Sequence, residues 1–207
     1  MAATTHAVVP PAHQPVEVSA ESIWRLSVDQ YHAMIQAGIL TDDDPVELLE
    51  GWLVTKMSKN PKHRVVTQLI REAIAQILPT GWYVDVQEPV TTKDSEPEPN
   101  VAVVRGNRRQ YFDHHPSPQD IALVVEVADS SLRRDRTLKK RIYAAAGISI
   151  YWIVNLLANE IEVHSEPSEP SEQPDYRQQQ TFGLEDTIAI ILHGREIGSL
   201  SVRELLS

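Results

Sequence analysis

The strongest constraint in this sequence is one carboxylate inside an apolar strand. Ile121 to Val127 is the most strand-like run of the chain, and Glu126 interrupts it. Burying a carboxylate in a strand is costly unless it has a partner, a proton or a metal ion. A second short apolar strand, Val101 to Val104, is opened by the polar Asn100. We therefore expect the functional site to lie where these two strands present Asn100 and Glu126.

The segment that follows Glu126 predicts a helix and then a third strand. Ser130 or Ser131 can cap the helix, and Gly147 can end it. Ile148 to Asn155 is again apolar, so a strand–helix–strand unit spans 121–155 and its two strands are expected to be parallel. This unit indicates an α/β protein.

Capping signals mark two further helices. Ser27 with Gln30 forms a capping box for a helix that ends at Gly38. Asn60-Pro61 opens a longer helix that runs to about Leu78, with apolar residues at helical spacing. The remaining predicted elements are a hairpin over 46–57, a strand at 82–86, a hairpin of 161–163 with 176–182, a strand at 187–192, a turn at 194–195 and a terminal element at 202–206.

Two polar segments rich in proline predict loops. Thr91 to Pro99 and Ser165 to Glu172 are expected to be exposed and mobile. The tryptophans behave differently, because Trp52, Trp82 and Trp152 fall on apolar strands. We therefore expect all three in the core rather than on a surface that stacks nucleic-acid bases.

Length and composition fit one domain. The 207 residues suit a single domain, placed at 21–207, after a tail at 1–20 that is rich in Pro, Ala and Thr. No apolar run approaches the roughly 20 residues of a membrane span, and the first residues lack the pattern of a signal peptide. The absence of cysteine removes disulfides and thiolate metal sites. A cytoplasmic protein without membrane contact is the simplest expectation.

Charge distribution adds a second constraint. A net charge of −10 weighs against a passive nucleic-acid binder, because clustered Lys and Arg neutralise phosphates. Basic residues nevertheless cluster on the helix predicted after Glu126. They predict a local nucleic-acid-binding face, with Arg133, Arg134 and Arg136 as its contacts. The whole cluster consists of Arg133, Arg134, Arg136, Lys139, Lys140 and Arg141.

Glu126 and its neighbours carry groups that a metal-dependent hydrolase needs. Mg²⁺ binds oxygen ligands and usually takes one or two protein carboxylates besides water and phosphate. Hydrolysis of a phosphodiester also requires an activated water and a cation beside the developing charge. Glu126, an oxygen ligand at position 100 and Lys139 could supply this set. The structural alternatives are a buried Glu126 paired with one arginine and a Lys139 on a solvated basic helix face.

Several motifs along the chain point to one family. They are Glu47 to Val54, His63, Pro97 to Val104, Val124 to Val127, Asp135-Arg136 with Lys139 and Tyr143, Ala146 to Ile148, and Tyr151 to Val154. Together they resemble the Uma-type restriction endonuclease family, which is abundant in cyanobacteria and belongs to the PD-(D/E)XK nuclease superfamily. The resemblance covers about residues 25–165. It implies a restriction-endonuclease-like mixed β-sheet flanked by helices and a Mg²⁺-dependent site acting on DNA. The last strands add a C-terminal β-hairpin extension.

The resemblance also assigns roles residue by residue. Glu126 matches the second metal ligand of the family. Lys139 matches its lysine, which has moved from the strand to the next helix and left Ala128 in the original position. Glu47 matches a carboxylate at the mouth of the site, with a surface strand residue as the alternative. His63 matches a family histidine and is either a phosphate contact or a solvated helix end.

Asn100 departs from the family pattern, which has Asp at this position. An amide lacks the negative charge of a carboxylate, so Mg²⁺ affinity should fall. The favoured function is Mg²⁺-dependent cleavage of DNA, weakened by Asn100. One alternative is a catalytically inactive nuclease fold that binds nucleic acid or a protein partner. Another is a structural homo-oligomer, at its simplest a homodimer, that pairs through the strands at 148–154 and 161–163.

Overall fold

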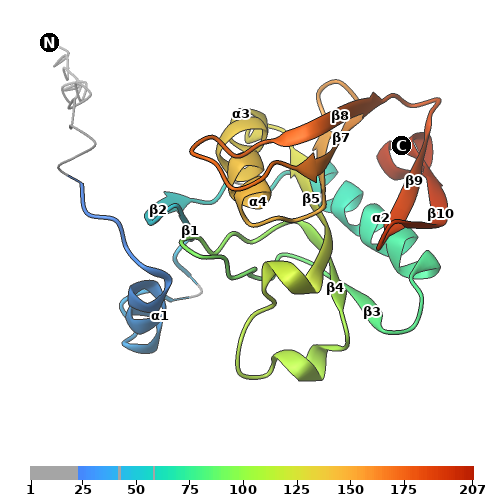
Figure 1. Cartoon of the computed structure of the whole chain (residues 1–207). Helices are drawn as coiled ribbons and strands as arrows, with labels where there is room; N and C mark the ends of the chain where they lie inside the picture. Colours follow the sequence, from blue (N-terminus) through green and yellow to red (C-terminus); the bar gives the residue numbers. More distant parts are fainter. Residues whose placement is uncertain (1–22, 42, 58) are drawn as a thin grey trace, which may run out of the picture.

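A six-stranded mixed β-sheet forms the centre of the structure, a computed structural model that describes residues 23–41, 43–57 and 59–207 (Figure 1). β5 and β6 run parallel, and the other neighbouring strands run antiparallel. The parallel pair confirms the strand–helix–strand unit predicted for 121–155. In order across the sheet, the strands are β3 (Trp82–Asp85), β4 (Val101–Arg105), β5 (Ile121–Ala128), β6 (Ile150–Asn155), β7 (Glu160–Pro167) and β8 (Tyr176–Phe182).

One face of the sheet carries the larger apolar core. α2, the antiparallel β9–β10 hairpin and the short helix α5 lie on this face (Figure 1). Ile70 and Ile74 of α2 are both 0% exposed and pack among side chains of the sheet. The hairpin confirms the predicted C-terminal extension. The bounds of these elements are α2 Pro61–Ile77, β9 Thr187–Leu192, β10 Arg195–Ser201 and α5 Val202–Leu206.

The helical segment after β5 covers the opposite face. It comprises α3 (Leu132–Arg134), a π-helical turn labelled η4 (Asp135–Lys139) and α4 (Lys140–Ala145). Gly147 follows with a φ of 74°, a left-handed conformation that glycine adopts without a steric penalty, and the predicted helix end is confirmed.

The alternation of side chains along β5 decides which face receives Glu126. Successive residues of a strand point to opposite faces of the sheet. Val125 and Val127 belong to the core beneath α2, whereas Val124 and Ala128 belong to the core beneath α4. Glu126 therefore points toward the helical segment that carries Lys139.

Both predicted N-terminal helix caps are confirmed. The Ser27 hydroxyl accepts a hydrogen bond from the Gln30 N–H at 3.1 Å, and the Gln30 side chain accepts one from the Ser27 N–H at 3.0 Å. Asn60 Oδ1 accepts a hydrogen bond from the His63 N–H at 2.8 Å. Such bonds satisfy donors that have no partner inside the helix. They fix the starts of α1 (Val28–Gln36) and α2.

The β1–β2 hairpin packs beside the end of the sheet. β1 (Val46–Leu49) and β2 (Trp52–Thr55) pair antiparallel, and a further bridge joins Leu48 to Glu96. Glu96 is only 3% exposed, and Ser95 and Pro97 beside it are also buried. The expectation of an exposed loop over 91–99 is therefore wrong. The segment instead connects the hairpin to the sheet and holds β1 close to β4.

Other sequence-based expectations need correction. β7 extends to Pro167, so only the later part of the predicted 165–172 loop is a loop. The strands at 148–154 and 161–163 lie inside the sheet, whose edges are β3 and β8, and they offer no free edge for a homo-oligomer. Trp152 is buried, but Trp52 and Trp82 are only partly buried, each with an arginine guanidinium over its ring.

Some expectations concern parts that the structure does not describe or test. The predicted tail at 1–20 lies outside the described residues, and the single domain at 21–207 stays a prediction. Among the helices of the described residues, none is long and apolar enough to cross a membrane. The polar stretch between β4 and β5 contains two short 3₁₀ helices, η2 (Arg108–Tyr111) and η3 (Pro118–Asp120).

Ile70→Ala should lower the free energy of unfolding by about 2–5 kcal/mol, because truncating a fully buried side chain leaves a cavity. Val65→Ala in the same helix should change it by less than about 0.5 kcal/mol, since Val65 is 50% exposed. Urea unfolding of both variants measures the difference. Equal losses would contradict the assignment of the main core to this face of α2.

Candidate active site

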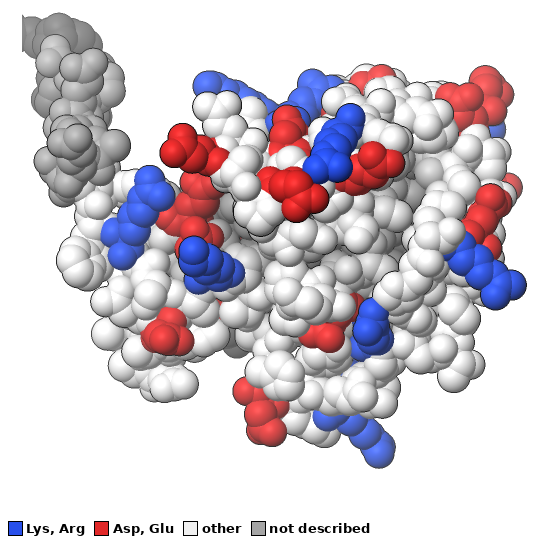
Figure 2. Space-filling view, viewed as in Figure 1, with Lys and Arg blue, Asp and Glu red and all other residues white. Residues whose placement is uncertain are grey.

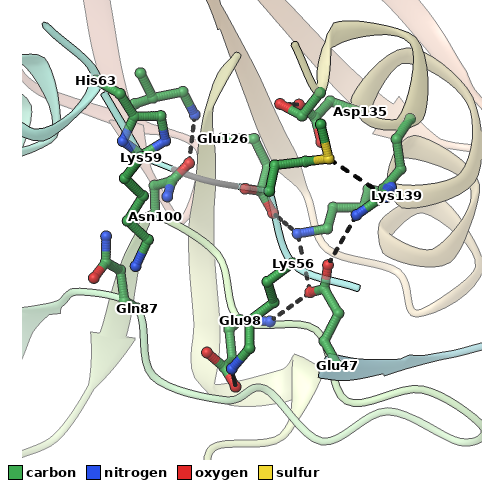
Figure 3. A pocket seen from close by; sticks show the side chains of 14 residues that line it. Glu47, Lys56, Lys59, His63, Gln87, Glu98, Asn100, Glu126, Asp135 and Lys139 are labelled. Carbon is green, nitrogen blue, oxygen red and sulfur yellow. Dashed lines mark hydrogen bonds and ion pairs between the residues drawn. The ribbon is translucent and has the colours of Figure 1, made fainter. Parts of the chain in front are cut away.

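Two carboxylates and a lysine from separate elements meet at one small cavity (Figure 3). Glu126 comes from β5, Glu47 from β1 and Lys139 from the end of the π-helical turn. Lys139 Nζ lies 2.9 Å from Glu126 Oε1 and 3.1 Å from Glu47 Oε2. The cavity of about 60 Å³ is several times the roughly 10–15 Å³ that one water molecule needs. The lysine thus joins two acids beside a space with room for a small group.

All three charged residues are removed from solvent. Glu47 is 2% exposed, Glu126 4% and Lys139 5%. Glu126 pairs with Lys139, not with an arginine, and its Oε1 also accepts a hydrogen bond from the Tyr143 hydroxyl at 2.8 Å. Glu47 Oε2 accepts a further hydrogen bond from the Glu98 N–H at 3.2 Å. The structural alternatives for Glu126 and Lys139 and the reading of Glu47 as a surface residue are therefore wrong.

The π-helical turn aims Lys139 into the cavity. Such a turn inserts an extra residue into a helix and is frequent at functional sites. The Asp135 carbonyl accepts hydrogen bonds from the Lys140 N–H and, at 3.1 Å, from the Tyr151 hydroxyl. The Asp135 carboxylate accepts one from the Ser131 hydroxyl at 2.6 Å. Asp135 and Lys139 have the spacing of a helix-surface ion pair, yet both side chains are buried and line the cavity.

Asn100 enters the same cavity from the start of β4. Val101 pairs with Val125 in the antiparallel register, which places Asn100 next to Glu126 on the neighbouring strand. Asn100 Oδ1 accepts a hydrogen bond from the Val127 N–H at 2.7 Å. The structure thus brings Asn100, Glu126 and the helix bearing Lys139 to one cavity, as the sequence predicts, while their roles in catalysis stay predictions.

Burial changes the ionisation of the acids and the lysine. It raises the pKa of Glu126 from 4.5 to about 7, although the charge of Lys139 opposes this rise. Burial also raises the pKa of Asp135. Burial alone would lower the pKa of Lys139, but the charges of Glu126, Glu47 and Asp135 outweigh it and hold that pKa above its ordinary value. At neutral pH the site therefore holds a charged lysine and a Glu126 that readily exchanges a proton.

His63 lines the cavity from the first turn of α2. The residue is 9% exposed, and its Nδ1 is buried without a hydrogen-bond partner among the described residues. Burial, and then the charge of Lys59, lowers the pKa of His63 and favours the neutral ring. The alternative of a solvated helix end is therefore wrong. A contact between His63 and phosphate stays a prediction.

Most of the basic cluster is paired with acids. Figure 2 shows Lys and Arg side chains interspersed with Asp and Glu on this face of the molecule, not gathered into one basic patch. Arg134 also donates to the Thr55 carbonyl at 2.9 Å, whereas Arg133 is exposed. Nucleic-acid contacts by Arg133, Arg134 and Arg136 stay a prediction. The ion pairs of the cluster with acids outside it are Arg134–Glu47, Arg136–Glu160, Arg136–Glu162, Lys139–Glu47, Lys139–Glu126, Lys140–Asp175 and Arg141–Glu50.

The oxygen atoms of the cavity fit a hard divalent cation by type. Carboxylate and amide oxygens are the ligands that Mg²⁺ prefers. Glu126 Oε1 is taken by Lys139, but its Oε2 has no hydrogen-bond partner among the described residues. Asn100 contributes an oxygen without a charge. No group of three or more His, Asp or Glu within the described part of the chain is arranged to hold a metal ion. The donor set therefore suits a weakly held cation.

Several residues at the cavity were not predicted from the sequence as parts of the site, among them Asp135, Tyr143, Lys59 and Gln87. Asp135 and Tyr143 stand in the family motifs, which is the signal that could have found them. Lys59 and Gln87 carry no such signal, because they lie in short connections before α2 and after β3. Lys59, Gln87 and Asp135 line the cavity, and Tyr143 contacts it through Glu126.

The fold and the buried cavity define a nuclease-type α/β protein, and the comparisons agree. The model of the Uma2 family, described as "Putative restriction endonuclease", matches residues 28–202, and the chain belongs to this family. The crystal structure of a "putative nuclease belonging to DUF820" from Anabaena variabilis ATCC 29413 is similar, with a TM-score of 0.61. The match has 14% identity and covers 87% of this chain and 97% of that chain, and at this identity it shows the fold alone. No curated protein matches the chain.

Glu126→Gln should flatten the pH dependence of stability. The folded protein holds the Glu126 proton more tightly than the unfolded chain, because burial raises the pKa from 4.5 to about 7. This contribution is full below pH 4.5 and is lost as the pH rises through 7. Between pH 5 and 8 the stability of the wild type relative to the variant should fall by an amount on the order of a few kcal/mol. Urea unfolding across this range measures it, and parallel profiles would contradict the shift.

Proposed function

We propose that this chain is an endonuclease that hydrolyses DNA phosphodiester bonds with the help of a divalent metal ion such as Mg²⁺. The observation that carries the proposal is the meeting of Glu126, Lys139 and Asn100 at one buried cavity in a member of this family. The likeness of the fold to that of a nuclease supports it.

Glu126 and Asn100 would hold the metal ion through their carboxylate and amide oxygens. When bound, the ion supplies Lewis acidity toward the phosphate and lowers the pKa of a water molecule. Because Glu126 releases its proton only near pH 7, metal binding should strengthen as the pH rises through this value.

The remaining residues have roles that do not depend on the ion. The raised pKa of Lys139 keeps its ammonium charged, so it can stabilise the negative charge that develops on the phosphate. Glu47 holds Lys139 in place through the second ion pair.

DNA would approach along the side of the cavity that carries the helical segment. Arg134 lines the cavity, and Arg133 and Arg136 lie on the same segment. Together with His63 they are the proposed phosphate contacts. Such binding weakens steeply with salt, because each phosphate contact releases condensed counterions.

One observation favours a second candidate function. Asn100 supplies no charge, and its oxygen is already engaged by the Val127 N–H. A nuclease fold that binds nucleic acid or a protein partner without cutting is consistent with this bond. The two candidates differ in whether restoring a carboxylate at position 100 restores metal binding and cleavage.

Asn100→Asp should raise Mg²⁺ affinity at least about tenfold, which corresponds to about 1.4 kcal/mol, because it adds one ligand charge in a shielded cavity. DNA cleavage should appear or increase in this variant. Adding Glu126→Ala or Lys139→Ala to this variant should abolish the gain in DNA cleavage. Calorimetric Mg²⁺ titration and a plasmid-nicking assay measure both effects.

Asn107→Asp is a matched control, because Asn107 is exposed and lies outside the cavity. It makes the same change in net charge and should leave metal affinity unchanged. Negligible Mg²⁺ binding by both the wild type and Asn100→Asp would overturn the metal site and leave the non-cleaving candidate.

A further inference from the structure

The cavity has two chemically different sides. In Figure 3, Glu47, Asp135 and Lys139 lie on one side, where acids and lysine neutralise each other. His63, Lys59, Asn100 and Gln87 lie on the other side, and none of these four is an acid. We name this second side the amide–lysine corner. Its residues offer hydrogen-bond donors and one positive charge, which is the chemistry that receives an anion.

Asn100 turns its donor group toward this corner. Because the Val127 N–H can only donate, the side-chain atom that faces it must be Oδ1, and this contact fixes the orientation of the amide. The amide nitrogen forms no hydrogen bond with a described residue, although Asn100 is only 8% exposed and lines the cavity. Because Asn100 lines the cavity and its oxygen is engaged by the Val127 N–H, this nitrogen is free to donate to an acceptor bound there.

Lys59 brings the positive charge. The other two lysines of the cavity, Lys56 and Lys139, are paired with carboxylates, whereas Lys59 forms no salt bridge within the described residues. Lys59 is an exposed residue at the rim of the cavity; partial burial lowers its pKa, and the charge of Glu98, which also lines the cavity, opposes this shift. An anion in the corner would compensate this charge.

Gln87 and the start of α2 complete the corner. Gln87 has a φ of 59°, a left-handed conformation that is uncommon for a residue other than glycine, and its N–H donates to the Pro99 carbonyl at 3.0 Å. This bond holds Gln87 next to Asn100. His63 places the first turn of α2 against the cavity, and the N-terminal end of a helix favours negative charge.

We infer that the amide–lysine corner binds a phosphate group of a nucleic-acid strand without a metal ion, through the Asn100 amide, the Lys59 ammonium and the Gln87 side chain. This inference deepens the proposed function, on which the identity of the strand rests. The replacement of a carboxylate by Asn100 has a second consequence here. It weakens a cation site and removes the charge that would repel a phosphate from the same corner.

The first test titrates the protein with inorganic phosphate in the presence of a metal chelator and follows binding by ³¹P NMR. The wild type should bind phosphate. Lys59→Met and Asn100→Asp should each weaken binding at least about tenfold. Asn100→Asp keeps the acceptor for the Val127 N–H, and urea unfolding checks that both variants stay folded. Lys93→Met, which removes an exposed lysine outside the cavity, is the control and should bind as the wild type does.

The second test identifies the source of the phosphate with three forms of one DNA oligonucleotide, again without metal. One form has a 5′-hydroxyl, one a 5′-phosphate and one neutral methylphosphonate linkages. Recognition of internal phosphodiesters predicts that the 5′-hydroxyl form binds and the methylphosphonate form does not. Recognition of a terminal phosphate predicts that only the 5′-phosphate form binds in a way that Lys59→Met weakens.

Unchanged phosphate affinity in both Lys59→Met and Asn100→Asp would overturn the inference, as would equal binding of the methylphosphonate form. Since metal is absent and cleavage is not measured, such a failure would leave the proposed endonuclease untouched. In the same way, a failure of Asn100→Asp to gain cleavage would leave the phosphate site untouched.

Discussion

The two ion pairs of the buried Lys139 ammonium are the interaction on which this structure depends most. Removing one charge from water is expensive, and the expense is offset only where partners are close and well oriented. Here Glu126 and Glu47 lie at 2.9 and 3.1 Å. A carboxylate can therefore occupy an apolar strand, and the β1–β2 hairpin is tied to the sheet by ion pairs as well as by the buried Leu48 and Leu49. The ion pairs join β5, β1 and the helical segment into one unit.

The irregular helix after β5 contributes to the same site. Its π-helical turn spans Asp135 to Lys139, and both of these side chains are buried and line the cavity. Tyr151 and Ser131 bond to Asp135 and keep the turn in place. The same residues thus satisfy the backbone of an irregular turn and position the lysine of the site.

Local patterns made much of the fold predictable, and long-range contacts limited the rest. The capping box at Ser27, the cap at Asn60 and the parallel strands around 121–155 depend on neighbours in sequence, and all are confirmed. The resemblance to a family placed Glu126, Lys139 and Asn100 together. The burial of 91–99 depends on β1, which lies more than 40 residues earlier, and no local signal reports such a contact. Lys59 and Gln87 were not predicted as site residues for the same reason.

The central claim is that Lys139 and Glu126 stabilise the fold as a pair, and a double-mutant cycle tests it most directly. At pH 8, where Glu126 is largely ionised, Lys139→Met should lower the free energy of unfolding by roughly 3–5 kcal/mol, because it leaves two buried carboxylates without their cation. Glu126→Gln should lower it by less, because Lys139 keeps its ion pair with Glu47. The double variant should be more stable than the sum of the two losses predicts, by about 1–3 kcal/mol. Strictly additive losses would contradict the pair and, with it, the account of how the cavity is built.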